Sequence, residues 1–310
     1  MKFGVEAHHF SGKFFEIKDW FCSRKYDGES ALWNSHTRGI LANTFSWSTE
    51  REISTGLWSL GRYSQPKIIH APDFWLDVLP KNIPLHGELW YNDNRSFVAS
   101  VCRKKYSSCI DWMLIKFIPH NIKPLSLWND KFFTPSMDFY RSDLPFWKKK
   151  NLLEQISSSS IFNMEYTIVN SSQYMNYLIQ ESIDRKWEGL IFNNPDGLYK
   201  LDRSWDILKY KNCYETEVKI IGYEDGKTGK NIGKTGALLC ELTWDNKIES
   251  IFGGNSSMIG LKVCFCICGL TEEERENLSK YYPIGKEILM SYYGVTNYGI
   301  PCHANIYRRK

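Results

Sequence analysis

A lysine in the segment 22–28 (CSRKYDG) constrains this 310-residue chain more than any other feature. An apolar run precedes Lys25, and Asp27 and Gly28 follow it, which predicts a strand that ends in a tight turn. A lysine held there points toward the pocket that the strand ends border. Positive charge nearby favours the unprotonated amine, which is a nucleophile. The pattern alone is common in surface turns, so its meaning depends on the segments that follow it.

The length of the chain exceeds that of one average domain and indicates two. The residues are 43% hydrophobic and 15% aromatic, which is enough to build sizeable cores. No apolar run reaches the length of a membrane span, and the first residues lack the apolar core of a signal peptide. Nine cysteines without paired metal spacing favour reduced thiols in a cytoplasm. The formal charge of +4 permits a polyanionic partner without requiring one.

Two short apolar segments each carry one acidic residue beside a glycine. Glu88 lies in the predicted strand 83–90 (IPLHGELW), and Glu188 lies in the predicted strand 187–192 (WEGLIF). An acid among large apolar residues is expected to be partly buried, and it then requires a partner such as a cation, a metal ion or a sugar hydroxyl. Both acids are therefore candidate site residues.

Three cations and one aromatic residue extend this set. Lys209 and Lys211 share a face of the predicted strand 208–211, where their charges repel unless an anion lies between them. Arg38, in the turn 37–39 (TRG), is placed to hold an anionic or ribose group. Phe117 lies near the end of the predicted strand 112–117, where an aromatic residue is more typical of a core than of a ligand platform. Taken alone, each of these residues also has an ordinary structural explanation.

The first two thirds of the chain contain further predicted elements. Helical spacing predicts helices over 70–79, 144–153 and 171–181, and a short apolar run predicts a strand over 98–102. The segment 119–143 is irregular and rich in Pro, Asn, Asp and aromatic residues, which predicts a surface loop.

After Lys211 the pattern changes. Three apolar strands, 218–223, 237–244 and 261–268, are separated by turn-rich segments, and 271–282 is predicted to form one helix that begins with a capping box. Short strands with a single helix suit a small barrel of the oligonucleotide-binding type. We therefore place the domain boundary near residue 212, which gives domains 1–212 and 213–310.

The loop 226–236 (GKTGKNIGKTG) combines glycines with lysines. It is not a P-loop, because Thr228 stands where that motif has its first glycine and because the loop joins two strands instead of opening a helix. Its lysines suit contact with a nucleic-acid backbone, and they are Lys227, Lys230 and Lys234. An ordinary solvated loop is the alternative.

Cys264, Cys266 and Cys268 alternate with apolar residues along the predicted strand 261–268. Their spacing places the three thiols on one face of the strand. A metal site would require further ligands that the sequence does not offer, so the three cysteines are expected to be small buried residues.

The order and spacing of these segments resemble the covalent nucleotidyltransferases, and among them ATP-dependent DNA ligases of the compact phage and virus kind. The matching segments, in order, are 25–28 (KYDG), 37–39 (TRG), 86–88 (HGE), Phe117, 188–192 (EGLIF) and 208–211 (LKYK). The segment 236–241 (GALLCE) resembles the barrel segment of DNA ligases in particular. The resemblance implies an α+β nucleotidyltransferase domain, with antiparallel sheets flanked by helices, followed by an all-β OB-fold barrel with one helix.

The resemblance also implies an activity. Lys25 would attack the α-phosphate of ATP, expel pyrophosphate and hold AMP as a phosphoramidate. AMP would pass to the 5′-phosphate of a nick, and the 3′-hydroxyl would displace it and seal the strand, as in replication, repair and recombination. The other implied roles are contact with the ribose and the reacting end (Arg38, Glu88), stacking on adenine (Phe117), Mg²⁺ or Mn²⁺ binding (Glu188, Glu88) and neutralisation of the α-phosphate (Lys209, Lys211).

The chain departs from the family pattern at three places. Ser30 stands where an arginine normally grips the 5′-phosphate of the nick, and Arg24 and Arg38 are the candidates to share that task. Ser23 stands where an acid is common. The last motif is matched loosely near Arg308 and Arg309, whose family counterparts orient pyrophosphate.

The expected partner is nicked duplex DNA, bound by a monomer that closes around it, in the cytoplasm of a cell or of a virus's host. No separate N-terminal DNA-binding domain is expected ahead of Lys25. The nearest rival is an RNA ligase or an RNA-capping nucleotidyltransferase with the same lysine chemistry. A non-catalytic nucleic-acid-binding protein with a degenerate pocket is the alternative of a different class.

Overall fold

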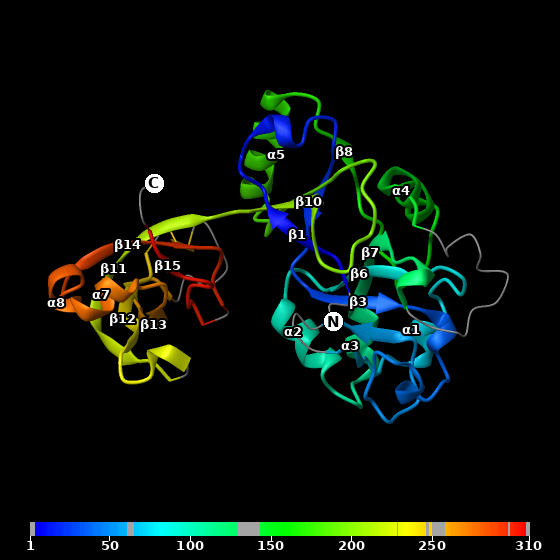
Figure 1. Ribbon diagram of the computed structural model, residues 1–310, viewed down its shortest axis with the longest axis horizontal. Helices are drawn as coiled ribbons and strands as arrows, with labels where there is room; N and C mark the ends of the chain where they lie inside the picture. The colour runs from blue at the N-terminus through cyan, green and yellow to red at the C-terminus, as the bar shows by residue number, and fades with distance from the viewer. Residues whose placement is uncertain are drawn as a thin grey trace. The chain divides into compact units, whose positions relative to one another are not determined.

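The computed structural model describes residues 4–60, 65–128, 143–227, 229–245, 248–249, 258–296 and 298–307. The chain forms two compact units, Met1–Tyr210 and Lys211–Lys310. The division falls two residues before the boundary expected from the sequence. Helices and strands are labelled in Figure 1.

The first unit contains two five-stranded sheets. The first sheet, sheet A, has the strand order β1 (Glu6–His9), β10 (Arg203–Lys211), β9 (Gly189–Asn193), β2 (Phe21–Lys25) and β8 (Thr167–Ile168). Strand β2 is antiparallel to β8 and β9, whereas β1 is parallel to β10. Helix α5 (Ser172–Asp184), which begins at the N-cap Ser171, packs Met175 and Leu178 into the core of this sheet. One strand pair thus departs from the antiparallel sheets that the resemblance implies.

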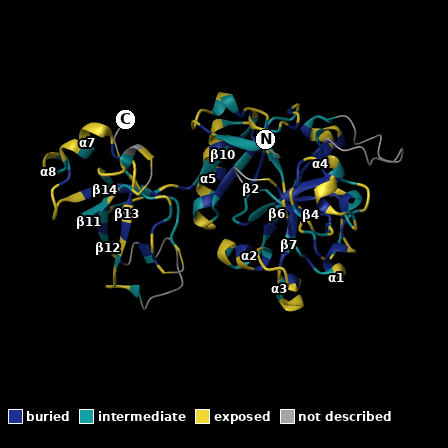
Figure 2. Cartoon of the chain, turned by 60° about the horizontal axis from the view of Figure 1, so that its bottom comes forward, coloured by how far each residue is buried: buried dark blue, intermediate teal, exposed yellow. Residues whose placement is uncertain are grey.

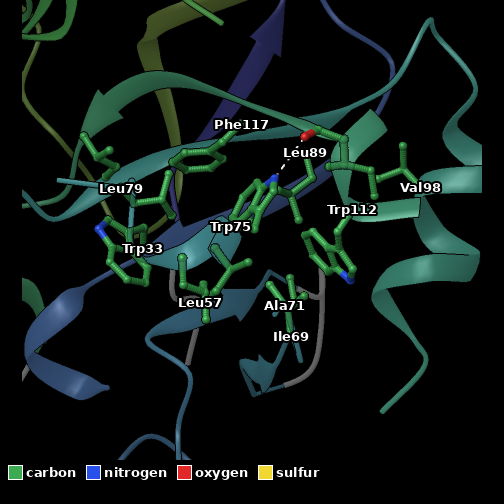
Figure 3. Close-up of a cluster of buried hydrophobic side chains, with 14 of the residues drawn as sticks. Trp33, Leu57, Ile69, Ala71, Trp75, Leu79, Leu89, Val98, Trp112 and Phe117 are labelled. Atoms are coloured by element: carbon green, nitrogen blue, oxygen red, sulfur yellow. Dashed lines mark hydrogen bonds between the residues drawn. The ribbon is translucent and has the colours of Figure 1, made fainter. Parts of the chain in front are cut away.

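The second sheet, sheet B, is antiparallel, with the order β5 (Lys67–Ile68), β4 (Leu57–Ser59), β3 (Glu29–Trp33), β6 (Leu85–Trp90) and β7 (Lys116–Ile122). Its largest core joins buried residues of the strands to those of α1 (Asp73–Leu76), α2 (Arg95–Cys102) and α3 (Cys109–Leu114), as Figure 3 shows. In this core the indole nitrogen of Trp75 donates a hydrogen bond of 3.0 Å to the carbonyl of Ile115. The tryptophans of the sequence are thus used largely in the core that supports sheet B.

The segment after Lys25 carries the chain from sheet A to sheet B, because β2 belongs to the first sheet and β3 to the second. Gly28 is required there, since a Cβ atom at this position would lie 2.1 Å from the carbonyl oxygen of Leu89 on β6. The expected strand is confirmed; in place of the expected tight turn the chain has a bend at Gly28 between the two sheets, and the lysine lies where these sheets meet.

The second unit contains one antiparallel sheet with the order β13 (Lys262–Ile267), β12 (Thr235–Thr243), β11 (Tyr214–Asp225), β14 (Glu287–Tyr292) and β15 (Asn305–Ile306). The predicted capping box of Thr271 and Glu274 is present. The single helix expected over 271–282 is wrong, since the chain breaks at Asn277 into α7 (Glu272–Glu276) and α8 (Leu278–Tyr281).

Several predicted elements of the first unit were assigned to the wrong type. The segments 98–102 and 112–114 were expected to be strands, and they belong to helices α2 and α3. The side chains of Asn94 and Ser108 cap these helices, and local capping outweighs the β-propensity of their apolar residues. The helix predicted over 70–79 shortens to α1, with Pro72 at its N-cap.

Other predictions are confirmed in outline. Helix α4 (Phe146–Glu154) begins after Pro145, and β9, β11, β12 and β13 match their predicted segments within a few residues. The surface loop predicted over 119–143 is wrong for its first part, where residues 119–122 end β7 and Asn121, Ile122, Lys123 and Leu125 are buried ahead of and within the short helix η4 (Leu125–Trp128); residues 129–142 lie outside the described residues. Further single turns are η1 (Phe14–Glu16), η2 (Ser35–Thr37), η3 (Ala42–Thr44) and η6 (Gly229–Asn231). Over the described ranges, no helix is long and apolar enough to cross a membrane.

The three cysteines of β13 share one face of the strand, as predicted, but the expectation that they are buried is wrong. Cys264 and Cys266 on β13, and Cys268 just after it, are exposed, whereas Phe265 and Ile267 are buried in the core of the second unit. Figure 2 shows this alternation of buried and exposed positions along the strands of the second unit. Because β13 is an edge strand, it has a neighbouring strand on one side only.

Candidate active site

A cavity of about 330 Å³ lies where the two sheets of the first unit meet. Sheet A contributes Ser23, Lys25, Ile191, Asn193, Ile207 and Lys209 to its lining. Sheet B contributes Ser30, His86, Glu88 and His120. Residues 4–7, around the start of β1, and Met164 complete much of the wall. The cavity therefore combines cations, an acid and apolar surface.

Lys25 lies at the end of β2, and its ammonium group donates a hydrogen bond to the carboxylate of Glu188. Both side chains are largely buried. Glu188 immediately precedes β9, the strand that pairs with β2, so the two residues are brought together by strand register across 163 positions of sequence. The expectation that these two segments share a site is consistent with this contact.

Glu88 lies on β6 directly opposite Ser30 on β3. Burial raises the pKa of the Glu88 carboxyl to about 8; the charge of Lys25 lowers it and that of Glu188 raises it. Glu88 is therefore within electrostatic reach of the lysine and of the second acid. At neutral pH the ligand-free protein holds Glu88 mainly in its protonated form.

Two neutral histidines form one wall of the cavity. The rings of His86 and His120 lie 4.5 Å apart. Ser30 Oγ is 3.2 Å from Nε2 of His86, and Tyr199 Oη is 2.9 Å from its Nδ1. Burial lowers the pKa of His86 well below its usual value; burial and the charge of Lys25 lower the pKa of His120 to about 4. Both rings therefore remain uncharged at neutral pH.

Arg24 touches the same cavity and also links the two sheets. Its guanidinium pairs with Asp93, which follows β6, and lies 4.6 Å from the ring of Tyr26 and 5.3 Å from that of Trp187. The indole nitrogen of Trp90 donates a 2.8 Å hydrogen bond to the same carboxylate. Asp93 has a positive φ of 54°, which is uncommon for a residue other than glycine. The arginine is thus held rigidly beside Lys25.

The role expected of Phe117 requires correction. Its ring is 0% exposed and packs in the core of sheet B, where Figure 3 shows it near Leu89. Strand register explains this placement, because Phe117 is paired with Leu89 and Ile118 with Glu88. His120, which falls at the irregularity in the register between β6 and β7, lines the cavity, and Phe117 does not.

Arg38 and Lys211 do not line the cavity. The Arg38 guanidinium binds Asp73 and Asp77 at 2.6 Å each, close to the surface. Lys211 begins the second unit, and its ammonium lies 5.8 Å from the ring centre of Tyr293. Of the two lysines predicted to hold the α-phosphate, Lys209 alone lines this cavity.

The lysine loop of the second unit is solvent-exposed where it is described. Lys227 lies 4.0 Å from Glu224, and Lys234 forms a 3.2 Å ion pair with Glu272. The side chain of Lys230 lies outside the described residues, as do Arg308 and Arg309. The nucleic-acid contacts predicted for this loop stay predictions.

Sequence reasoning missed His120, His86 and Met164 as lining residues. A partial signal was present, because period-two alternation from Ile118 places His120 on the same strand face. Nothing in the sequence joins Met164 to the site, since it lies outside the assigned strands and helices of the first unit.

Glu88 and Glu188 are the candidate metal ligands of this site. Among the described residues, no group of three or more His, Cys, Asp or Glu side chains is arranged to hold a metal ion. Glu88 and Glu188 nevertheless interact electrostatically beside Lys25. Two carboxylates suit an oxygen-preferring divalent cation that takes its remaining ligands from phosphate and water.

Comparison with known proteins agrees with this geometry. Residues 7–211 match the model of the ATP dependent DNA ligase domain. A DNA ligase of Haemophilus influenzae is 29% identical over 162 residues, which are 52% of this chain and 52% of that protein. A DNA ligase of Enterobacteria phage T4 is 24% identical over 160 residues, 48% of this chain and 30% of that protein. The match thus spans about half, or less, of these relatives.

Solved structures share the fold. A Lig E DNA ligase superposes with a TM-score of 0.72 at 20% identity, and each chain is covered completely. The ATP-dependent DNA ligase of bacteriophage T7, in complex with ATP, gives a TM-score of 0.50 at 15% identity, with 99% of this chain and 98% of that chain covered. Because the family model matches about two thirds of the sequence and includes Lys25, Glu88, Glu188 and Lys209, this chain belongs to the ATP-dependent DNA ligase family.

Proposed function

We propose that this chain is an ATP-dependent DNA ligase that seals nicks between a 3′-hydroxyl and a 5′-phosphate through a lysyl-AMP and a DNA-adenylate. The observation that carries the proposal is the position of Lys25 in a cavity at the junction of two sheets, with Glu88 and Lys209 also lining that cavity and Glu188 in contact with the lysine. This set provides a nucleophile, a phosphate-binding cation and acids at one cavity.

The first step follows from the contacts of Lys25. Its amine must leave Glu188 and lose a proton before it can attack the α-phosphorus of ATP. The nitrogen–phosphorus bond then forms as the bond to pyrophosphate breaks, and negative charge grows on the phosphoryl oxygens. Lys209, on the same cavity wall, is placed to stabilise that charge. Lys211, two residues on, would add to it if the second unit brings it near.

His120 is the residue that we assign to the base of ATP in place of Phe117. Its neutral ring can stack on a purine and can donate or accept a hydrogen bond. Met164 and Ile191 add apolar surface to the same cavity. Glu88, which is largely protonated before a ligand binds, can donate a hydrogen bond to a ribose oxygen.

Mg²⁺ or Mn²⁺ fits the acids of the site. Glu188 would hold the ion, and Glu88 would join it only in its ionised form; the charge of the ion, when bound, would polarise the phosphoryl oxygens and favour the unprotonated form of a nearby amine. If Glu188 held a metal ion, Lys25 would be released from its ion pair with this acid. The chain's own contribution is to place Lys25 and Glu88 in one cavity and Glu188 in contact with the lysine.

For DNA, we assign the 5′-phosphate of the nick to Arg24, with Arg38 as a second candidate. Arg24 is adjacent to Lys25 and fixed by Asp93, whereas Arg38 is engaged by two surface carboxylates. The second unit, with its five-stranded antiparallel sheet, suits an OB-fold barrel that closes on duplex DNA as part of a monomer. Its exposed Lys227 and Lys234 would contact the phosphate backbone.

The test is the mass of the intact protein after incubation with ATP and Mg²⁺, followed by a chase with nicked duplex DNA. A gain of one AMP that is lost as a sealed strand appears supports the proposal. If the protein gains AMP but transfers it only to an RNA end, RNA ligation or RNA capping would replace nick sealing in DNA as the proposed function. A folded protein that accepts AMP from neither ATP nor GTP would contradict catalysis altogether.

A further inference from the structure

Tyr199 lies outside the lining of the catalytic cavity, yet its hydroxyl reaches a residue of the cavity wall. The residue is 4% exposed, and Tyr199 Oη lies 2.9 Å from Nδ1 of His86. The other ring nitrogen of His86, Nε2, lies 3.2 Å from the hydroxyl oxygen of Ser30. Ser30 and His86 both line the cavity. The three side chains therefore form a hydrogen-bond network that leads from the protein interior to the cavity.

The backbone and the ring of Tyr199 are both held from outside this network. The backbone N–H of Tyr199 donates a hydrogen bond to the carboxylate of Asp143. Asp143 forms a 2.6 Å ion pair with Lys149, whose side chain is 2% exposed and whose ammonium group lies 5.7 Å from the centre of the Tyr199 ring. Because breaking a buried ion pair leaves an uncompensated charge, this support resists displacement. The hydroxyl of Tyr199 is thus fixed against His86.

The direction of the hydrogen bonds follows from the donors and acceptors available. His86 is 2% exposed and is bonded by two hydroxyls and by no carboxylate among the described residues, so its ring is neutral and carries one proton. Burial raises the pKa of Tyr199, while a hydrogen bond from the backbone of Val5 lowers it, so the phenol oxygen already accepts from an N–H. Within the described residues, the acceptor left for the tyrosine proton is Nδ1 of His86.

The opposite arrangement would leave a buried donor unpaired. If Nδ1 carried the imidazole proton, the Tyr199 oxygen would accept it, and the tyrosine proton would have no acceptor in a protein interior. With the proton on Nε2, Tyr199 donates to Nδ1, and Nε2 donates to the oxygen of Ser30. Ser30 then keeps its own hydrogen for an acceptor inside the cavity.

The charges of the cavity indicate which part of a nucleotide offers that acceptor. Lys25 and Lys209 line the cavity from sheet A. On sheet B, Ser30 lies beside His86 and directly opposite Glu88, so this side of the cavity presents a hydroxyl, an imidazole and a carboxyl group. Phosphates are drawn to the cations, whereas a sugar hydroxyl, which both donates and accepts, suits the groups of sheet B.

We propose that Tyr199 is a positioning residue, which fixes the Nε2–H form of His86 and so makes the Ser30 hydroxyl a hydrogen-bond donor to a ribose hydroxyl oxygen of the bound nucleotide. Tyr199 acts through His86 and Ser30 and does not touch the nucleotide itself. This inference rests on the proposed ligase function for the identity of the nucleotide, but the proton arrangement of the network requires no ligand.

The first measurement is the tautomer of His86 in the ligand-free protein, read from the ¹⁵N chemical shifts of its ring. We expect Nε2–H in the wild type and a mixture of both tautomers in Tyr199→Phe, which removes only the hydroxyl. The matched control is Tyr166→Phe, because the hydroxyl oxygen of Tyr166 is buried, has no hydrogen-bond partner among the described residues and lies outside the cavity lining. This control should leave the tautomer unchanged. A wild-type His86 with its proton on Nδ1 would overturn the proposal.

The second measurement is the KM for ATP in single-turnover AMP charging, followed by intact mass. The net worth of a neutral hydrogen bond corresponds to about 2- to 12-fold in affinity, so we expect Ser30→Ala to raise the KM about fivefold and Tyr199→Phe about threefold. The rate at saturating ATP should change by less than about twofold, since the bond holds the ribose and not the reacting phosphate. The double variant should be no worse than Ser30→Ala, because Tyr199 acts through Ser30. Additive effects, or a Tyr199→Phe variant that matches Tyr166→Phe, would overturn the positioning role.

Nucleotides that lack one ribose hydroxyl show where the Ser30 proton goes. The effect of Ser30→Ala on the KM should disappear with either 2′-deoxy-ATP or 3′-deoxy-ATP, whichever lacks the acceptor. An equal effect with ATP and both analogues would mean that the acceptor is not a ribose hydroxyl, and the proposal would fail. A wild type that gains no AMP contradicts the proposed ligase function instead, while the tautomer of His86, measured without nucleotide, still tests the network.

Discussion

The two units of this chain each contain a concave region, and the two regions carry different charge. The cavity of the first unit is lined by three cations (Arg24, Lys25, Lys209) and two acids (Glu6, Glu88). The groove on the sheet of the second unit has a volume of about 650 Å³ and is lined by two lysines (Lys219, Lys262) and five acids (Glu215, Glu217, Glu241, Asp245, Glu287). A nucleotide or a DNA backbone is attracted by the first region and repelled by the second.

The difference indicates which surfaces a polyanion can use. If the second unit contacts DNA, the acidic groove is not the contact surface, and the exposed lysines of the loop after β11 are the better candidates. Concavity alone therefore does not identify a site, and the sign of the lining charges separates the two regions. The five predictions that follow test this contrast, beginning with the largest expected effect.

Replacing Lys25 by Ala should abolish AMP charging. The variant lacks the nucleophile, so the rate should fall by at least about 10³-fold, measured by the intact mass of the protein after incubation with ATP. Because Lys25 is paired with Glu188, the double variant Lys25→Ala/Glu188→Gln controls for an unpaired buried acid. If Lys25→Ala still charges at the wild-type rate, the cavity is not the catalytic site.

Lys209→Ala should slow charging more than Lys211→Ala. Lys209 lines the cavity and Lys211 does not, so we expect losses of about 10²-fold and less than about 10-fold, from the stabilisation of developing phosphoryl charge. The measurement is the single-turnover rate of charging at saturating ATP. Equal losses would show that both lysines reach the α-phosphate, as the sequence pattern predicts.

His120 and Phe117 lie on opposite faces of β7, and replacing them should have different effects. His120→Ala should raise the KM for ATP about tenfold, with little change in melting temperature, while His120→Phe should retain the stacking surface. Phe117→Ala should instead cost roughly 3–5 kcal/mol of unfolding free energy, because its ring is fully buried. A raised KM without loss of stability in Phe117→Ala would restore the adenine-stacking role to Phe117.

The contrast between His120 and Phe117 shows which parts of the site could be predicted from the sequence and which could not. The motifs 25–28, 86–88, 188–192 and 208–211 predicted Lys25, Glu88, Glu188 and Lys209 as residues of one site, because each motif places a charged side chain on or beside a short apolar strand. The sequence could not decide whether Phe117 or His120 faces the ligand, since that depends on the register of β7 against β6. Helices α2 and α3 were missed because the prediction gave more weight to their apolar, strand-like residues than to the capping residues Asn94 and Ser108.

The pH dependence of the protein's stability should reveal the raised pKa of Glu88. Its folded pKa of about 8 lies above the ordinary value of 4.5, so its contribution to stability is fully present below about pH 4.5 and is lost as the pH rises through 8. Glu88→Gln cannot ionise and should lack this loss. We expect the melting temperature of the wild type to fall relative to that of Glu88→Gln by roughly 5 °C between pH 6 and pH 9. Parallel curves would show that Glu88 is ionised in the ligand-free protein.

The smallest expected effects concern the second unit, where the contrast between groove and loop can be tested directly. Glu217→Gln/Glu241→Gln removes two negative charges from the acidic groove, and Lys227→Ala/Lys234→Ala removes two positive charges from the loop. If DNA meets the loop, the loop variant should lower the slope of log affinity against log salt by about 1–2 for nicked duplex DNA. The groove variant should leave the slope unchanged and alter affinity by less than about twofold, because its charges act only at a distance.

The opposite pattern would reverse this assignment. A groove variant that binds DNA several-fold more tightly with a steeper slope would mean that the backbone passes close to the five acids, where each charge removed relieves a repulsion at short range. Charging with ATP should be unaffected in both variants if the groove and the loop take no part in the first step. A loss of charging in the loop variant alone would place Lys227 or Lys234 near the triphosphate, and the role of that loop would move from DNA binding to nucleotide binding.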